Sequence, residues 1–263
     1  MKLLALMAFA VFAHLALAAT EPQGSCEKIR SATNRSGKAI NLVFVASGFN
    51  GQMAHFEESI RTFWAGMEDY APFSRDVDSL NVFISKHENK ANSFCDYDGR
   101  KLHCNYLKGK SLGNKCDTTG KTKFIVIHNS TEYGGLGGEI PSASVNRDAV
   151  HLIVHELGHS LWDLADEYTD RDGVSHGKNC SSSSACAEWQ DLIDAGLASC
   201  QEGCNSNRFY SDETNVMRNF NQHSYGHVNR RLICCQFKRF TDEYPRFCDE
   251  YKDIGEGLDK FCR

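Results

Sequence analysis

The chain has 263 residues, 41% of them hydrophobic, which is enough for one large domain or two small ones with a sizeable core. Its charge is mildly acidic, with 29 lysines and arginines against 34 aspartates and glutamates and a formal net charge of -5. We find no basic run with interleaved aromatic residues of the kind that nucleic-acid binders use, so the sequence argues against a nucleic-acid partner.

The first residues indicate export. Lys2 supplies a positive start, an apolar stretch follows over residues 3–17, and the "ALA" of residues 16–18 makes a small-x-small cleavage site. We therefore predict a signal peptide over residues 1–18 and a secreted, extracellular protein. The apolar stretch is too short to span a bilayer comfortably, and no later run approaches the roughly 20 apolar residues that a spanning helix needs.

Twelve cysteines agree with an oxidising compartment, because a cytosolic chain of this size rarely keeps so many. Six disulfides are the simplest expectation, although their connectivity cannot be deduced from the sequence. Asn34 and Asn179 begin glycosylation sequons and are predicted to lie at the surface. Asn129 begins a third sequon, but we expect it to line a groove.

The first half of the chain has an α/β pattern. An apolar run over residues 39–49 predicts a strand, and residues 55–67 place their apolar side chains at helical spacing. Residues 80–85 and 123–128 are typical of further strands, and a glycine-rich turn follows the second. Residues 95–116 lack periodicity, so we predict a loop held by disulfides.

The second half is less regular. After Tyr168 the sequence is typical of loops, and helix is indicated only over residues 187–197 and after Gly226. We predict one catalytic domain over residues 19–263. An upper part would extend to about residue 166, and a lower, disulfide-rich and irregular part would begin at about residue 167.

Residues 151–168, "HLIVHELGHSLWDLADEY", hold the most informative pattern. An apolar stripe spaced four, three, four and three residues apart predicts a helix packed on the core. The stripe consists of Val150, Val154, Leu157, Leu161 and Leu164. At about 100° per residue, His155 and His159 lie almost opposite the stripe and one turn apart, where two imidazoles can grip one ion. His151 lies nearer the stripe, and we interpret it as structural.

The pattern is H-E-x-x-H on a helix, which suits hydrolysis. Two neutral imidazoles hold Zn²⁺, the ion acidifies a bound water, and the adjacent carboxylate of Glu156 takes the proton. A solvated surface of histidines is the plainer alternative. A catalytic zinc also needs a third protein ligand. On a continuous helix neither Asp163 nor Asp166 could easily reach the ion, so the chain must break and return. Asp166 is then the better candidate, with Glu167 second.

At this point the sequence resembles the IgA-peptidase-like metallopeptidases, or igalysins, a branch of the metzincin zinc proteases. The resemblance covers most of the mature chain and is more specific than the five-residue motif. It rests on "VFVASGF", "HNSTEYGGLGG" (128–138), "HELGHSLWDLADEY" (155–168), the spaced cysteines, tryptophan and glycines of residues 186–204, and "NVMR" around Met217.

The resemblance implies a zincin-like fold, a twisted sheet with an active-site helix, and a protein or peptide substrate. It implies His155, His159 and Asp166 as zinc ligands, Glu156 as general base, and Met217 as the methionine of a turn beneath the metal. The family often has glycine at the place of Asp163. Metzincins more generally place the third ligand one residue earlier, at Ala165 here, which leaves the choice between Asp166 and Glu167 open.

Some rival interpretations stay open at this level. Met217 alone would be interpreted as core filling, and His223 and His227 are rival ligands that we rank below Asp166. The glycine-rich run is expected to let a substrate backbone approach the edge of the sheet closely. The main alternative to a secreted zinc endopeptidase is a catalytically silent secreted zinc-binding or interaction protein on a protease-like fold. A disulfide-rich structural module is a third.

Overall fold

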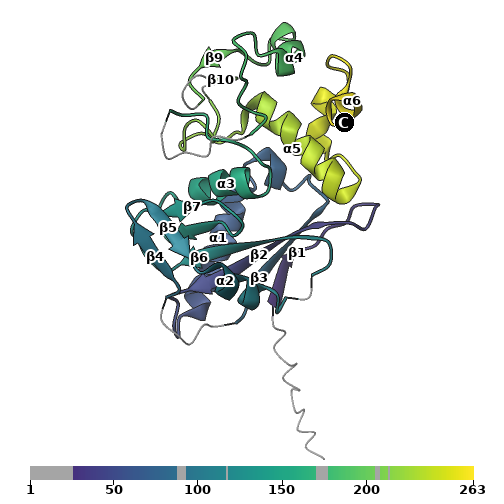
Figure 1. Cartoon of the computed structure of the whole chain (residues 1–263). Helices are drawn as coiled ribbons and strands as arrows, with labels where there is room; N and C mark the ends of the chain where they lie inside the picture. The colour runs from purple at the N-terminus through teal and green to yellow at the C-terminus, as the bar shows by residue number, and fades with distance from the viewer. Residues whose placement is uncertain (1–25, 88–92, 117, 170–176, 205–207, 213) are drawn as a thin grey trace, which may run out of the picture.

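An eight-stranded sheet organises the first part of the chain (Figure 1). The computed structural model describes residues 26–87, 93–116, 118–169, 177–204, 208–212 and 214–263, so the predicted signal peptide lies outside the described residues. The strand order is β1-β3-β2-β6-β8-β7-β5-β4. The strands are β1 (Cys26–Arg30), β2 (Ile40–Ser47), β3 (Leu80–Ser85), β4 (Cys95–Asp98), β5 (Lys101–Cys104), β6 (Lys121–His128), β7 (Gly135–Leu136) and β8 (Ser142–Ser144).

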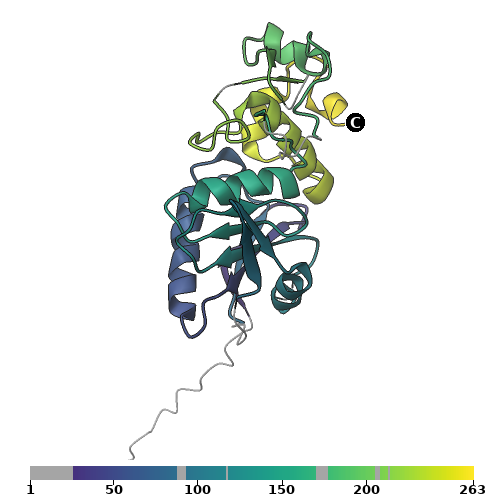
Figure 2. The ribbon, with the colours of Figure 1, turned by 60° about the vertical axis from the view of Figure 1, so that its left-hand side comes forward.

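The centre of the sheet is parallel and buried on both faces. Strands β3, β2, β6 and β8 are parallel neighbours, and helices in the connections from β2 to β3 and from β3 to β6 cover the faces. Along β2, alternate side chains enter different clusters: Phe44 packs in the main core, whereas Val43 and Val45 pack with Leu112 of α2. Helices α1 (Met53–Met67) and α3 (Ala149–Ser160) lie on one face of the sheet and α2 (Tyr106–Gly113) on the other (Figure 2).

The far edge of the sheet is antiparallel except for one parallel pairing, that of β5 with β7. Strands β4 and β5 form a hairpin, and β5 meets β7 through a single residue pair, Lys101 with Gly135. β7 runs antiparallel to β8. These strands are short, and they bring the hairpin turn at residues 98–101 beside the glycine-rich run that follows β6.

Most of the predicted elements of the first half are confirmed, and one is wrong. The strand at 39–49, the helix at 55–67 and the strands at 80–85 and 123–128 correspond to β2, α1, β3 and β6. The predicted loop at 95–116 instead forms β4, β5 and α2. Its strands are too short for a visible alternation, and the Asn105 side chain caps α2 by accepting a hydrogen bond from Lys108 N.

The later part of the chain lies on the other side of α3 from the sheet (Figure 1). It has little strand, and its longest element is the helix that follows Tyr225. Its elements are η2 (Ala187–Trp189), α4 (Gln190–Asp194), β9 (Gln201–Glu202), β10 (Phe209–Tyr210), α5 (Gly226–Thr241), η3 (Arg246–Tyr251) and α6 (Leu258–Phe261), while η1 (Ala71–Phe73) follows α1. The expected helix at 187–197 is thus mostly confined to η2 and α4, and the helix after Gly226 is confirmed.

All twelve cysteines are paired, as the even count predicts. The pairs are Cys26–Cys116, Cys95–Cys104, Cys180–Cys204, Cys186–Cys200, Cys234–Cys248 and Cys235–Cys262. None of the helices in the described part of the chain combines the length and apolar character needed to cross a bilayer. The predicted mixed α/β architecture with a sheet and a disulfide-rich later part is therefore confirmed, while its metzincin-like classification stays a prediction.

Candidate metal centre

Helix α3 carries the H-E-x-x-H pattern and packs on the core through its apolar stripe. Val154 and Leu157 are fully buried. The helix crosses α1 closely, because a Cβ on Gly66 of α1 would lie only 2.9 Å from a Val150 methyl carbon. α3 is therefore held firmly against the sheet, and its opposite side faces the later part of the chain.

The helix ends after Ser160, and the chain then turns back. Asp163 has a φ of 59°, in the left-handed region, and the Leu164 N–H donates to the Gly158 carbonyl over 3.0 Å. Aspartate is one of the few non-glycine residues that adopts this conformation at modest cost. Asp163, where the resemblance leads one to expect glycine, therefore adopts the left-handed conformation itself. The break that a third ligand requires is present.

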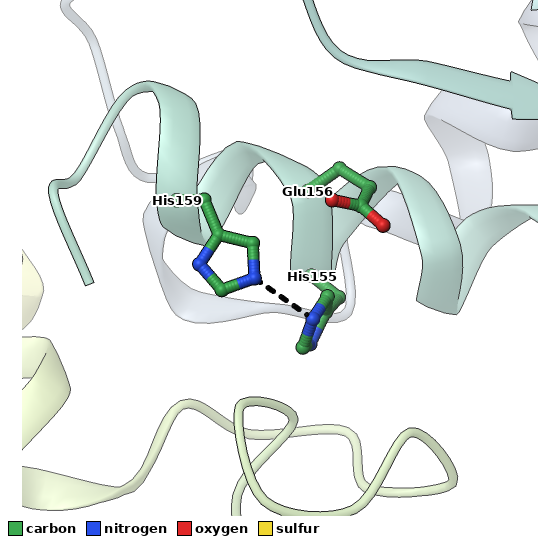
Figure 3. A group of neighbouring side chains, drawn as sticks. All are labelled: His155, Glu156 and His159. Carbon is green, nitrogen blue, oxygen red and sulfur yellow. Dashed lines mark hydrogen bonds between the residues drawn. The ribbon is translucent and has the colours of Figure 1, made fainter. Parts of the chain in front are cut away.

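Both imidazoles of the motif are oriented by backbone carbonyls. His155 Nδ1 lies 3.0 Å from the Val216 carbonyl oxygen, and His159 Nδ1 lies 2.7 Å from that of Leu164. A carbonyl only accepts hydrogen bonds, so each Nδ1 is the protonated, donating nitrogen. Each Nε2 is consequently left with its lone pair, as a metal ligand requires. Figure 3 shows the two rings pointing toward one another, with 3.0 Å between the Nε2 atoms.

Asp166 completes a three-atom group. Its Oδ1 lies 3.1 Å from His155 Nε2 and 3.2 Å from His159 Nε2, and the side chain is almost completely buried. Ligand atoms about 2.0–2.1 Å from a tetrahedral ion lie roughly 3.3 Å apart, so these spacings fit one face of a zinc site. Two lone pairs and a carboxylate oxygen facing one another also favour a cation between them. The residues present therefore fit a metal ion.

The electrostatics of these groups agree with their geometry. Burial alone would raise the pKa of Asp166, but its contacts with His155 and His159 hold that pKa below the usual range. Burial lowers the pKa of His159, yet the carboxylate of Asp166 outweighs burial and raises it. The negative charge of Asp166 thus favours a positive charge at this point, whether a proton or a metal ion.

Glu167 points away from the histidines. Its carboxylate is fully buried and accepts three amide hydrogen bonds, from Asn179 at 3.0 Å, Asn215 at 2.8 Å and Asn229 at 2.8 Å. Its backbone N–H donates to the Met217 carbonyl at 2.9 Å. Burial raises the pKa of Glu167 to about 7, although the three amides oppose this. The structure therefore brings Asp166, and not Glu167, to the two histidines.

Glu156 lies beside the same centre but on another side of α3 (Figure 3). Ligand-type atoms of His155, Glu156 and His159 all lie within 4.8 Å of one another. Burial raises the pKa of Glu156, an effect that the two histidines oppose. A Cβ on Gly137 would lie 2.9 Å from Glu156 Oε2, so the glycine-rich run approaches this carboxylate as closely as the backbone allows.

Met217 is fully buried beneath α3. A Cβ on Gly158 of the motif would lie 2.4 Å from the Met217 sulfur, so only glycine at position 158 permits this approach. The preceding residue, Val216, supplies the carbonyl that holds His155. The side chain is part of the main core, as the core interpretation expects, while its role as the methionine of a turn beneath a metal stays a prediction.

The remaining candidate residues lie elsewhere. His151 Nδ1 lies 2.6 Å from the Tyr70 hydroxyl, the His223 ring packs against that of His151, and His227 pairs with Glu250. Asn34 lies in a polar turn, where its amide donates to Ser36 and Lys38.

The expectation that both sequons mark the surface is wrong for Asn179. Its side chain is fully buried and bonds to both the N–H and the carbonyl of Ala165, besides Glu167. Asn129, the sequon that we expected in a groove, is partly buried and donates its amide to the Gly48 carbonyl.

A cavity of about 350 Å³ opens at the centre, and several of its residues had no signal in the sequence. The Phe220 ring lies 4.3 Å from that of His155, and Tyr168 stacks on His155 at 6.3 Å. Tyr168 ends the quoted stretch and Phe220 follows Met217 closely, so their positions near the motifs were a usable hint. Tyr133, which also lines the cavity, lies inside the quoted glycine-rich run, whereas Arg100 had no such hint.

Part of the chain is similar to a known protein family. The family model described as IgA Peptidase M64 matches residues 93–198, a segment that contains His155, Glu156, His159 and Asp166. This segment is therefore similar to the IgA-peptidase-like family. The resemblance drawn from the motifs is confirmed, and the family supports a peptidase that acts on protein and uses a metal. A search of curated proteins found no match.

Proposed function

We propose that the protein is a secreted zinc-dependent metalloendopeptidase, with its catalytic domain over residues 19–263. One observation carries this proposal: three possible ligand atoms lie within 3.0–3.2 Å of one another, in a segment that matches a peptidase family. These atoms are His155 Nε2, His159 Nε2 and Asp166 Oδ1. The six disulfides fit an oxidising, extracellular environment.

The three ligands would hold Zn²⁺, which when bound supplies a Lewis acid for the scissile carbonyl and lowers the pKa of a water molecule. The carbonyls of Val216 and Leu164 keep both imidazoles in the ligating tautomer. Glu156 accepts the proton of the attacking water and returns it to the leaving amine. Met217 and Gly158 fix the floor of the site through their close packing.

The substrate backbone is proposed to bind beside the glycine-rich run. β7 pairs with β5 only at Gly135, while Leu136 and Gly137 line the cavity. An extended peptide would add there as a further strand, in the manner of β-augmentation, and carry its scissile bond past Glu156. Glycines beyond the single β5–β7 pair would permit the close approach, since a Cβ on Gly137 would lie 2.9 Å from Glu156 Oε2.

Replacement of Glu156 by Gln tests the proposal. The variant keeps the shape and all three ligands, so its zinc content, measured by elemental analysis, should equal that of the wild type. Cleavage of a fluorescein-labelled, denatured protein mixture should fall by about 10²–10⁴-fold, because the general base is lost. Glu202→Gln, which changes an exposed carboxylate on β9, is the matched control and should keep full activity.

Other outcomes are equally informative. Full cleavage by the Gln variant contradicts the role of Glu156. Stoichiometric zinc without cleavage in either protein supports the silent binding protein instead. If chelation of the wild type with 1,10-phenanthroline leaves cleavage intact, the metal mechanism is wrong.

A further inference from the structure

A second pair of histidines lies one turn before the H-E-x-x-H pattern. His151 precedes His155 by one turn of α3, and its ring centre lies 4.9 Å from that of His223, with 71° between the ring planes. The rings of His155 and His159 have nearly the same arrangement, with 4.7 Å between their centres and 89° between their planes. Imidazole is a preferred ligand of zinc, nickel and copper ions, and two rings this close can bind one ion between them.

The Tyr70 hydroxyl fixes the orientation of the His151 ring. The hydroxyl oxygen lies 2.6 Å from His151 Nδ1 and 3.2 Å from the carbonyl oxygen of Gln222, to which the hydroxyl donates. A hydroxyl has one proton, so both hydrogen bonds form together only when His151 Nδ1 donates to the Tyr70 oxygen. His151 Nε2 then keeps its lone pair. A hydrogen bond of this kind on the other ring nitrogen is what orients metal-binding histidines in proteins.

His223 has the rotational freedom that a second ligand needs. Its side chain is exposed, and its ring packs against those of Tyr70 and His151. Neither ring nitrogen of His223 makes a hydrogen bond to a residue that the structure describes. The ring can therefore turn about its side-chain bonds and direct a nitrogen at an ion on His151 Nε2, because no hydrogen bond has to break.

The protonation state of His151 also suits a metal ligand. Burial lowers the pKa of His151, and the neighbouring His223 lowers it further. The carboxylate of Asp148, which precedes the first turn of α3, acts in the opposite direction but does not reverse the shift. The ring is therefore neutral near pH 7, and the neutral imidazole is the form that binds a metal.

The two histidines belong to segments that both shape the metal centre. His151 lies on α3, whereas His223 lies in the segment over residues 216–225. The first residue of this segment, Val216, supplies the carbonyl that orients His155. An ion between His151 and His223 would hold the segment against α3, beside the ligand that the segment orients.

We propose that His151 and His223 bind a second divalent ion of the imidazole-preferring kind, such as Zn²⁺, and that this ion clamps the segment 216–225 to α3. Water molecules complete the coordination. Because only two protein ligands hold the ion, it binds about 100-fold more weakly than a zinc ion with three, so the site fills only when zinc is abundant. The inference goes beyond the proposed peptidase activity and does not depend on it.

Calorimetric titration with Zn²⁺ tests the site. The protein is first loaded with one equivalent of zinc, so that the tighter centre at Asp166 is filled. The wild type and the control His103→Asn, which changes an exposed histidine on β5, should bind one further zinc ion. His151→Asn and His223→Asn should bind it at least about tenfold more weakly. Asparagine at position 151 keeps a donor for the Tyr70 hydroxyl and removes the ligand atom.

Hydrogen–deuterium exchange tests the clamp without any measurement of cleavage. With free zinc at about ten times the dissociation constant of the second site, exchange that requires opening of residues 216–225 should slow about tenfold in the wild type. His103→Asn should respond in the same way. In His151→Asn and His223→Asn the exchange of this segment should stay unchanged at the same zinc concentration.

The outcomes separate this inference from the proposed function. A loaded wild type that takes up no further zinc, or a second zinc ion that binds both site variants as tightly as the wild type, overturns the second site. Unchanged exchange over residues 216–225 in the wild type overturns the clamp. If the wild type binds a single zinc ion, its loss in Asp166→Ala alone overturns the second site and leaves the catalytic centre standing. Its loss in His223→Asn alone supports the second site and contradicts the catalytic centre.

Discussion

Strand β2 is buried along its whole length and pairs with neighbours on both sides, whereas β9 and β10 of the later part have two residues each. The sheet region (residues 26–166) contains two disulfides, and the disulfide region (residues 177–263) contains four. In the first region, regular strands bury enough apolar surface to stabilise the fold. The second has little regular structure outside α5 and is cross-linked instead.

The two buried carboxylates at the junction of the regions have different partners. In the chain that joins them, the Glu167 carboxylate takes hydrogen bonds from Asn179, Asn215 and Asn229, which lie on three separate segments of the later part. The adjacent Asp166 faces back toward α3 of the sheet region. Two neighbouring carboxylates therefore face opposite regions, Asp166 toward the histidines of the sheet region and Glu167 toward the amides of the disulfide region.

The largest expected effect comes from removing the first of these carboxylates. Asp166→Ala leaves two imidazoles, too few for a stable site, so zinc affinity should fall by more than about 100-fold. Glu167→Gln keeps all three ligands but brings an amide against three amide donors. It should lower zinc affinity by about 10–100-fold and the free energy of unfolding by about 1–3 kcal/mol.

Competition with a fluorescent zinc chelator and urea denaturation measure the two quantities. Glu250→Gln, on the more exposed η3, is the control for a glutamate-to-glutamine change. Equal zinc loss in Asp166→Ala and this control, or greater loss in Glu167→Gln than in Asp166→Ala, contradicts the assignment of the third ligand.

The next effect separates the regions by their cross-links. Removing the Cys186–Cys200 pair by double alanine substitution should lower the free energy of unfolding by about 2–4 kcal/mol, because little other structure closes that loop. Removing Cys95–Cys104 in the same way should cost less, since the β4–β5 hydrogen bonds still join the strands. Thermal unfolding of the two variants measures the difference. An equal or larger loss for Cys95–Cys104 would show that the hairpin also depends on its disulfide.

The smallest effect concerns the turn by which the chain leaves the sheet region. Asp163→Gly should change the free energy of unfolding by less than about 1 kcal/mol, because relief of the left-handed conformation is offset by a more flexible unfolded chain. Asp163→Val should destabilise by about 1–2 kcal/mol, since a branched side chain resists a φ of 59°. Guanidinium titration of both variants tests this. If valine is tolerated as well as glycine, the backbone of this turn rearranges.

Local sequence pattern was sufficient to predict the elements that carry a clear helical period or a long apolar run of their own. The stripe on α3 and the spacing of His155 and His159 follow from one helical period, and β2 and β6 follow from their apolar runs. The β4–β5 hairpin was missed because four-residue strands show no alternation. The break in the helix after Ser160 could be predicted, because the third ligand could not otherwise reach the ion. The left-handed conformation of Asp163 at this break could not be predicted.

The rest of the site depends on convergence from distant segments. Arg100 reaches the cavity only because the hairpin joins the sheet next to β7, and no local signal marks that pairing. The choice of Asp166 over Glu167 required the positions of three asparagines 12, 48 and 62 residues away from Glu167. The prediction for Asn179 was wrong for the same reason. Three consecutive residues define its sequon, whereas its burial depends on segments that are distant in the sequence.

The burial of Asn179 has a consequence for biosynthesis. If the chain enters a eukaryotic secretory pathway, as proposed, its triplet would be an acceptor for oligosaccharyltransferase, yet the folded protein encloses the same amide against Ala165 and Glu167. A glycan on Asn179 Nδ2 would therefore prevent this nitrogen from making its buried hydrogen bonds to Ala165 and Glu167. Yield in a eukaryotic host then depends on a race between the transferase and the folding chain, whereas export to a bacterial periplasm without that transferase avoids the competition.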